Sequence, residues 1–285
     1  MKNGVGSNLK VIVHLGFPKT ASSTLQFGPL LKLEKAGLIN LMTWRKNDSS
    51  ESLKDRPSSC LFRNIQIHRK YKELKTDMLN VLSDESFTAP TRLRNCNFGK
   101  DIINPINFPA EIRCQLENAS KKKITEFHWL MVLRKQSSLI ASQYVEEYNW
   151  KRFNNTDLLF NDKGEIDLDG YEIYNFANYI SSIERLSKNH GDKMTVLLYE
   201  DMHFESDNFY NSFDKVFGVK SGFFKKSFQE NFHNSKNKSN FGTFTKDGKY
   251  FIPFFRDELL ESIDDYFLRD NKRLSKYIDK DKVLR

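Results

Sequence analysis

The fold is decided by a stretch near the start of the chain, VIVHLGFPKTASSTLQ (residues 11–26). Its first five residues are mostly apolar and β-prone, which is typical of a buried parallel strand. Gly16 and Pro18 end that strand, and an apolar pattern with helical spacing begins at Leu25. A strand, a tight turn and a helix N-terminus favour a bound anion, because the first helical amides point outward and the helix dipole attracts negative charge.

The turn between this strand and helix carries one lysine among small residues. Lys19 supplies a point charge, and four neighbours supply hydroxyl donors: Thr20, Ser22, Ser23 and Thr24. A Walker A loop would need G-x-x-x-x-G-K-[ST], but Lys19 follows Gly16 by three residues and no Gly-Lys pair is present. The turn therefore predicts a site for a phosphate-sized group that is not a Walker A loop. The alternative is a structural turn with an exposed lysine.

A second apolar strand, predicted over residues 127–133, ends at Arg134. The guanidinium group of an arginine can bind two phosphate oxygens at once. Ser142 follows eight residues later, two turns into the next predicted helix, from which it can reach the same phosphate. Taken alone, Arg134 could instead pair with a surface carboxylate.

A third apolar run, residues 78–82, leads into Ser83-Asp84-Glu85-Ser86. The carboxyl ends of parallel strands are where ligands bind in open α/β sheets. Three interpretations remain open for these acidic residues. Glu85 is a general base, or Asp84 is a Mg²⁺ ligand of Walker B type, or Ser83 or Asp84 caps a helix.

The succession of strands and helices predicts an α/β fold with a P-loop-like central parallel sheet of about five strands, covered by helices on both faces. We expect strands near residues 11, 38, 79, 127 and 194, the last running to Asp201. We expect helices over 25–36, 65–79, 109–119, 171–188, 209–217 and 256–277. Residues 1–285 are predicted to form a single domain.

Composition narrows the classes of function without choosing one. The formal net charge of +8 suits an acidic partner. Three widely spaced cysteines, Cys60, Cys96 and Cys114, suggest neither a zinc site nor a disulfide framework. We see no apolar leader and no run long enough to span a membrane, so we expect a cytoplasmic protein. The oligomeric state is left open.

The turn and the arginine segment together resemble the donor-binding motifs of sulfotransferases that use 3′-phosphoadenosine-5′-phosphosulfate (PAPS), in particular bacterial enzymes of the carbohydrate type. Pro18 to Thr24 match P-K-[ST]-G-[ST]-[ST], with Ala21 in place of the glycine. The segment Arg134 to Tyr144 matches R-[ND]-P-x-x-x-x-x-S-x-Y, with Lys135-Gln136 replacing the usual pair after the arginine. Glu85 matches the glutamate of the S-x-E strand end in glycan sulfotransferases, and the likeness covers most of the chain.

This resemblance implies sulfuryl transfer from PAPS to a hydroxyl or amine of a saccharide, such as a glycan or glycolipid, leaving adenosine 3′,5′-bisphosphate (PAP). It implies that Lys19 stabilises the leaving phosphate oxygen and that Glu85 takes the acceptor proton. The 5′ end of the donor would be held by the loop residues Lys19, Thr20, Ala21, Ser22, Ser23 and Thr24. Arg134 and Ser142 would hold the 3′-phosphate. No metal and no nucleic acid are implied.

Two other classes of function stay open. One is a P-loop phosphotransferase, with Lys19 on the phosphates and Asp84 on Mg²⁺. The absence of a Gly-Lys-[ST] element counts against it. The other is a non-catalytic protein that binds anions or nucleic acid through its net charge, although no basic-aromatic recognition motif supports it.

Overall fold

The computed structural model describes residues 9–17, 20–43, 74–84, 109–149, 179–188, 191–203, 206–230, 243–244, 250–251 and 257–278. Five strands within these ranges form one parallel sheet in the order β2-β3-β1-β4-β5. The strands are β1 (Lys10–Leu15), β2 (Ile39–Met42), β3 (Leu79–Asp84), β4 (Glu126–Leu133) and β5 (Lys193–Leu198). The predicted α/β class with a central parallel sheet is confirmed.

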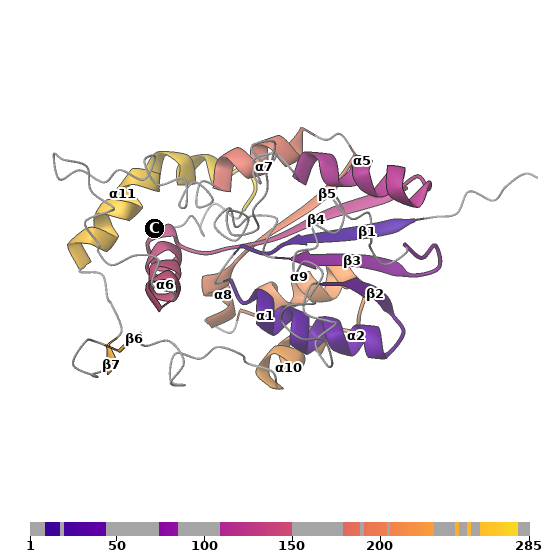
Figure 1. Cartoon of the computed structure of the whole chain (residues 1–285), viewed down its shortest axis with the longest axis horizontal. Coiled ribbons are helices and arrows are strands. Elements are labelled where there is room, and N and C mark those ends of the chain that lie inside the picture. The colour runs from indigo at the N-terminus through magenta and orange to yellow at the C-terminus, as the bar shows by residue number, and fades with distance from the viewer. Residues whose placement is uncertain are drawn as a thin grey trace, which may run out of the picture.

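Helices cover both faces of the sheet (Figure 1). One face packs against α5 (Pro109–Ser120), α7 (Tyr179–Ser187) and α11 (Asp257–Leu274). The other packs against a continuous helical segment, α1 (Ser22–Leu25), η1 (Gln26–Leu30) and α2 (Leu31–Lys35), and against α8 (Tyr199–His203), α9 (Asp207–Phe217) and α10 (Phe223–Glu230). The helix α6 (Gln136–Asn149) follows β4 and contacts α11.

The alternation of side chains along β1 shows why its sequence is apolar throughout. Val11, Val13 and Leu15 enter the core beneath α5 and α7, whereas Ile12 enters the core beneath α1 and α9. Both faces of a parallel sheet are buried, so such a strand needs apolar residues at nearly every position. The exception is His14, which is fully buried on the same face as Ile12.

The first helical segment ends where Gly37 adopts a left-handed conformation with φ 73°. The amide of Leu38 then donates to the carbonyl of Leu33 at 3.0 Å, which closes the last turn. Within the segment, five residues from Gln26 form a π-helical turn that contains Pro29. Because proline has no N–H to donate, a widened turn is one way of placing it inside a helix.

Several predicted boundaries differ from the structure. Residues 74–78 form a turn rather than the end of a helix, and the strand predicted over 194–201 ends at Leu198, where α8 begins. Tyrosine is β-prone, so Tyr199 extended the apparent strand. The sequence prediction also missed α10 and the short hairpin of β6 (Thr243–Phe244) and β7 (Tyr250–Phe251). Helix α7 begins at Tyr179, and the rest of its predicted range, like helix 65–73, lies outside the described residues.

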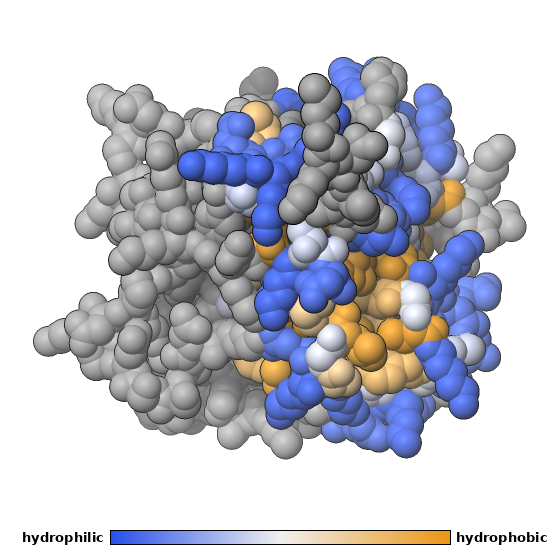
Figure 2. Space-filling view, turned by 90° about the vertical axis from the view of Figure 1, so that its right-hand side faces the viewer, coloured by the Kyte–Doolittle hydropathy of each residue, from blue (hydrophilic) through white to orange (hydrophobic). Residues whose placement is uncertain are grey.

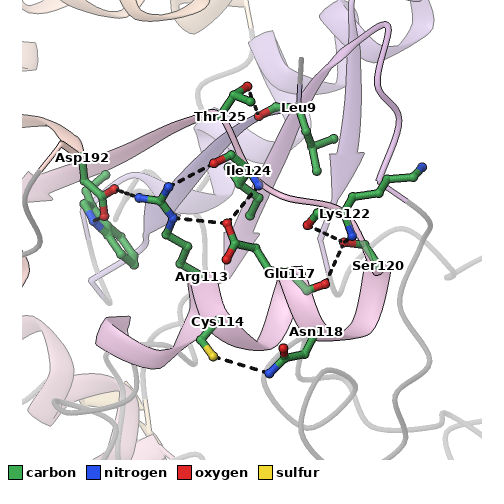
Figure 3. A network of polar contacts seen from close by, with 11 residues as sticks. Leu9, Arg113, Cys114, Glu117, Asn118, Ser120, Lys122, Ile124, Thr125 and Asp192 are labelled. Atoms are coloured by element: carbon green, nitrogen blue, oxygen red, sulfur yellow. Dashed lines mark hydrogen bonds and ion pairs between the residues drawn. The ribbon is translucent and has the colours of Figure 1, made fainter. Parts of the chain in front are cut away.

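A network at the amino ends of β4 and β5 anchors α5 to the sheet (Figure 3). The Arg113 guanidinium pairs with the buried carboxylate of Asp192 and donates to the carbonyl of Ile124 at 3.0 Å. The other oxygen of Asp192 accepts from the indole N–H of Trp129 at 3.1 Å. Glu117 accepts from the amide of Ile124 at 2.9 Å. These contacts lie at the edge of the sheet opposite to the predicted anion site.

Asn80 of β3 makes a second set of contacts at the same amino edge of the sheet. Its side-chain amide is fully buried, donates to the carbonyl oxygens of Lys10 and Lys75 at 3.0 and 2.8 Å, and accepts from Asn40 at 2.8 Å. It therefore joins β1, β2 and the turn before β3 through one side chain.

In the coloured part of Figure 2, hydrophilic residues surround a smaller apolar area. Leu38, with 58% of its surface exposed, is the most exposed large apolar residue in the described ranges. No helix in those ranges combines the length and apolar character that a membrane span requires.

Candidate functional site

The strands that precede the predicted site residues, β3, β1 and β4, end side by side at the carboxyl edge of the sheet. In the register of the sheet, Leu15 of β1 lies beside Asp84 of β3 and Met131 of β4. The chain leaves β1 toward the face covered by α1 and α2 but reaches β4 through α5 on the opposite face. In open α/β sheets, ligands usually bind beyond the carboxyl ends of the strands at such a reversal.

The loop after β1 folds back on its own backbone. The hydroxyls of Thr20 and Ser22 both donate to the carbonyl oxygen of Phe17, at 2.7 and 3.3 Å, and the amide of Phe17 donates to Leu15 at 3.0 Å. Helix α1 starts directly after Ala21, whose carbonyl accepts from the amide of Leu25 at 2.9 Å. The described residues on the two sides of the loop therefore contact each other, and a helix N-terminus follows, as the sequence predicted. Pro18 and Lys19 lie outside the described residues.

Ala21 has a left-handed backbone, with φ 61° and ψ 20°. It occupies the position at which the resembled motif carries glycine. The left-handed region is costly for residues with a Cβ atom, so glycine is the favoured residue there. The substitution noted in the sequence therefore falls on a backbone position that strains alanine.

The four loop hydroxyl groups differ in what they already bind. Thr20 and Ser22 brace the loop through Phe17, and this commits their hydroxyl hydrogens within the protein. Ser23 and Thr24 lie in the first turn of α1 and are buried. That Ser23 and Thr24 contact a ligand stays a prediction.

Arg134 follows β4, and its guanidinium contacts Ser138 and Tyr199. Its Nε and Nη2 atoms donate to Ser138 Oγ at 3.0 and 2.7 Å, and its guanidinium carbon lies 4.7 Å from the centre of the Tyr199 ring. Only 8% of the residue is exposed. A hydroxyl and an aromatic face orient the guanidinium, and an arginine oriented in this way suits the binding of an anion.

Sequence reasoning proposed Arg134 and Ser142 as site residues, which stays a prediction, and it did not point to Ser138 or Tyr199. Ser142 is half-buried on α6, one turn beyond Ser138 on the same helix face. The spacing of four residues from Arg134 to Ser138 was a usable signal, because that serine opens the helix after the strand. No local signal pointed to Tyr199, since its contact with Arg134 comes from pairing between β4 and β5.

Tyr179 connects the two predicted anion-binding segments. Its ring packs edge-on against Phe17 with centroids 4.9 Å apart, and its hydroxyl donates to the carbonyl of Arg134 at 2.8 Å. Burial raises the pKa of the Tyr179 hydroxyl, so it remains a proton donor. The loop after β1 and the arginine after β4 therefore meet through one buried side chain.

The resembled motif has Asn/Asp-Pro after its arginine, whereas in this chain side chains from distant elements contact the turn after Arg134. Glu200 accepts from the amide of Lys135 at 2.9 Å, and the Lys135 amine pairs with Asp264 of α11 at 2.8 Å. Gln136 and Asn271 exchange two side-chain hydrogen bonds, at 2.7 and 3.1 Å, within the core. Side chains from α8 and α11 thus fix the turn where a proline would otherwise stiffen it.

The end of β3 is only partly described. Ser83 is fully buried, Asp84 is the last residue of the strand, and Glu85 lies outside the described residues. Ser83 Oγ lies 2.8 Å from Nδ1 of His14 and accepts from Gln26 Nε2 at 3.0 Å. Burial lowers the pKa of His14 to about 3, so its imidazole is neutral. Within the described ranges, no group of three or more His, Cys, Asp or Glu residues is arranged to hold a metal ion.

Neither a family model nor a curated protein sequence matches this chain. Its structure is similar to that of a sulfotransferase from Alicyclobacillus acidocaldarius, with a TM-score of 0.49 and 12% identity over 93% of this chain and 94% of the other. It is also similar to mouse sulfotransferase SULT7A1 complexed with PAP, with a TM-score of 0.42 and 11% identity over 98% of this chain and 87% of the other. Likenesses at this level do not fix the activity.

Proposed function

We propose that this chain is a sulfotransferase that moves a sulfuryl group from PAPS to a hydroxyl or amine of an acceptor. One observation carries the proposal. The two segments that match donor-binding motifs are far apart in the sequence, but they follow the neighbouring strands β1 and β4. Tyr179 contacts both of them. A donor with phosphate groups at both ends of its nucleoside needs two anion sites that share one edge.

In this proposal the loop after β1 binds the 5′ end of the donor. Lys19 and the amides of the first turn of α1 face the phosphosulfate, with Ser23 and Thr24 as additional ligands. Lys19 compensates the charge that develops on the 5′-phosphate oxygen as its bond to sulfur breaks. Thr20, Ala21 and Ser22 hold the loop closed around this group, as their contacts with Phe17 and Leu25 suggest.

The 3′-phosphate binds at the end of β4. Arg134 supplies the charge, and Ser142 supplies a hydroxyl from the second turn of α6. Ser138 and Tyr199 hold the guanidinium in place before the ligand arrives. Preorganisation of this kind reduces the entropy lost on binding. The site would distinguish PAPS from nucleotides without a 3′-phosphate.

The acceptor side lies at the end of β3. Glu85 takes the proton as the acceptor oxygen or nitrogen forms its bond to sulfur, while the bond from sulfur to the 5′-phosphate oxygen breaks on the opposite side. A carboxylate in this role fits a saccharide acceptor, such as a glycan or glycolipid. No metal takes part in the proposed step, and residues 1–285 act as one catalytic domain.

Ligand-dependent stability tests the proposal without knowledge of the acceptor. PAP should raise the melting temperature in the absence of Mg²⁺, because a ligand at a hundred times its Kd stabilises by about 2.7 kcal/mol. Lys19→Ala and Arg134→Ala should each reduce this gain. Lys193→Ala is the control, because Lys193 pairs with Glu126 at the opposite edge of the sheet.

Other outcomes would replace the proposal with one of its rivals. Stabilisation by Mg-ATP alone would identify a phosphotransferase, and steeply salt-dependent binding of DNA or RNA would identify a nucleic-acid protein. If PAP binds, transfer from ³⁵S-labelled PAPS to oligosaccharides, lipids and phenols would identify the acceptor class.

A further inference from the structure

A row of buried polar side chains lies directly beneath the proposed donor loop. His14 of β1 and Ser83 of β3 are register partners on the same face of the sheet, and Gln26 of η1 packs over them. Gln26 Nε2 donates to both the hydroxyl and the carbonyl oxygen of Ser83, at 3.0 and 3.1 Å. His14 and Ser83 have no exposed surface, and Gln26 has 2%.

The donors and acceptors in this row define a direction. Because Gln26 donates to the Ser83 hydroxyl, the Ser83 hydrogen is available for Nδ1 of His14, 2.8 Å away. When the Ser83 hydroxyl donates to Nδ1, the imidazole proton is on Nε2. Chains of hydrogen bonds that run in one direction strengthen one another in a buried environment.

Stability does not explain why the row is polar. Among the described residues, Nε2 of His14 and Oε1 of Gln26 are buried without a hydrogen-bond partner. Leaving such atoms unpaired is unfavourable, and apolar side chains of similar shape would avoid the penalty. A polar cluster that is incompletely paired beside a ligand edge points to a role in function.

The row connects the two halves of the proposed reaction. Gln26 lies on the helical segment whose first turn carries Ser23 and Thr24, at the start of the π-helical turn. Ser83 immediately precedes the end of β3, where the acceptor-side carboxylate is proposed. Two hydrogen bonds from one Gln26 nitrogen reach both the side chain and the backbone of Ser83, so the donor helix directly restrains that strand end.

We propose that Gln26, Ser83 and His14 are positioning residues that hold the end of β3 at a fixed distance from the donor-binding helix. The inference rests on the proposed function, because it assigns the acceptor carboxylate to the end of β3. None of the three needs to touch the donor or the acceptor. Their loss would therefore slow the transfer step and leave donor affinity nearly unchanged.

Gln26→Met tests this idea, because methionine keeps the length of the side chain and removes its amide. We expect kcat for release of ³⁵S from labelled PAPS, to water or to an acceptor, to fall by about a hundredfold, as for a misplacement of about 1 Å. The Kd for PAP should stay within about twofold of the wild-type value. If Gln26→Met does not fold, Ser83→Ala takes its place. It removes one oxygen atom and should likewise lower kcat while leaving the Kd for PAP nearly unchanged.

Asn80→Leu is the matched control. Asn80 also has a fully buried side-chain amide and lies on β3, as Ser83 does. Its hydrogen bonds, however, are at the amino edge of the sheet, opposite to the proposed donor site. It should lower the denaturation midpoint at least as much as Gln26→Met and leave kcat close to the wild-type value. Nitrogen-15 NMR of His14 gives a readout besides activity: the Nδ1 signal should change in Gln26→Met and Ser83→Ala but not in Asn80→Leu.

Three results would overturn the inference. The first is a loss of kcat in Gln26→Met that Asn80→Leu matches, which would make the effect one of stability. The second is an equal loss of PAP affinity and kcat, which would make Gln26 part of the donor site. The third is wild-type kcat in both Gln26→Met and Ser83→Ala. A wild-type chain that binds PAP keeps the proposed function intact in each case, whereas failure to bind PAP overturns both.

Discussion

Replacing Ala21 with glycine should stabilise the protein relative to a matched substitution at the other end of the same helical segment. Ala21 precedes that segment with φ 61° and ψ 20°, whereas Ala36 follows it with φ −78° and ψ −1°. An L-residue in the left-handed region costs roughly 1–2 kcal/mol, which glycine avoids. Glycine also makes the unfolded chain more flexible, which costs about 0.4–1 kcal/mol at either position.

The two substitutions share the unfolded-state cost, so their difference isolates the backbone strain at Ala21. Ala21→Gly should range from nearly neutral to about 1.5 kcal/mol more stable, and Ala36→Gly should be about 0.4–1 kcal/mol less stable. The difference between the variants is therefore expected to be about 1–2 kcal/mol, or roughly a factor of 5–30 in the unfolding constant.

Urea denaturation of both variants and the wild type, without nucleotide and with a shared m-value, measures this difference. If Ala21→Gly is as destabilising as Ala36→Gly, the loop does not hold Ala21 in the left-handed conformation. The backbone conformation described for Ala21, in the loop after β1, would then be wrong.

Other consequences of the fold concern single side chains. Arg113→Ala should destabilise the protein by about 3 kcal/mol or more in urea denaturation, because it leaves the buried carboxylate of Asp192 without its cation, whereas the exposed pair of Lys193 should contribute little. Tyr179→Phe should cost about 1–3 kcal/mol by removing the buried hydrogen bond to the Arg134 carbonyl, and calorimetry should show weaker PAP binding; unchanged affinity would contradict the link between the two segments. The folded protein keeps His14 neutral down to a pKa of about 3, whereas the unfolded chain takes up that proton below about 6.5, so stability should fall by up to about 1.4 kcal/mol per pH unit as the pH drops through this window. His14→Asn should flatten that slope, and an unchanged slope would assign it to other groups.

The parts of the fold that follow from local chemistry could be predicted from the sequence. Apolar runs located all five strands of the sheet, and Gly37 marked the end of the first helical segment. These signals are local because a strand buried on both faces must be apolar along its length, and a left-handed helix end favours glycine. The position of Arg134 at a strand end followed from the same reasoning.

Contacts that depend on the order of the strands could not be predicted. Tyr199 meets Arg134 because β5 lies beside β4, and Tyr179 meets Phe17 because α7 returns over β1. Neither pairing has a fixed spacing in the chain. The contacts among His14, Ser83 and Gln26 were missed for a similar reason, since His14 appears in the sequence as a single polar residue within an apolar strand.

The hydrogen bonds between Gln136 and Asn271 affect how the protein is made. Gln136 lies two residues after Arg134, and its partner Asn271 lies on α11, 135 residues further along the chain. A ribosome releases the sheet strands long before it releases Asn271, and domains of this size often pass through intermediates. The turn after Arg134 therefore reaches its final arrangement only after Asn271 has been made. A nascent chain with all five sheet strands would still lack the contacts that fix this turn.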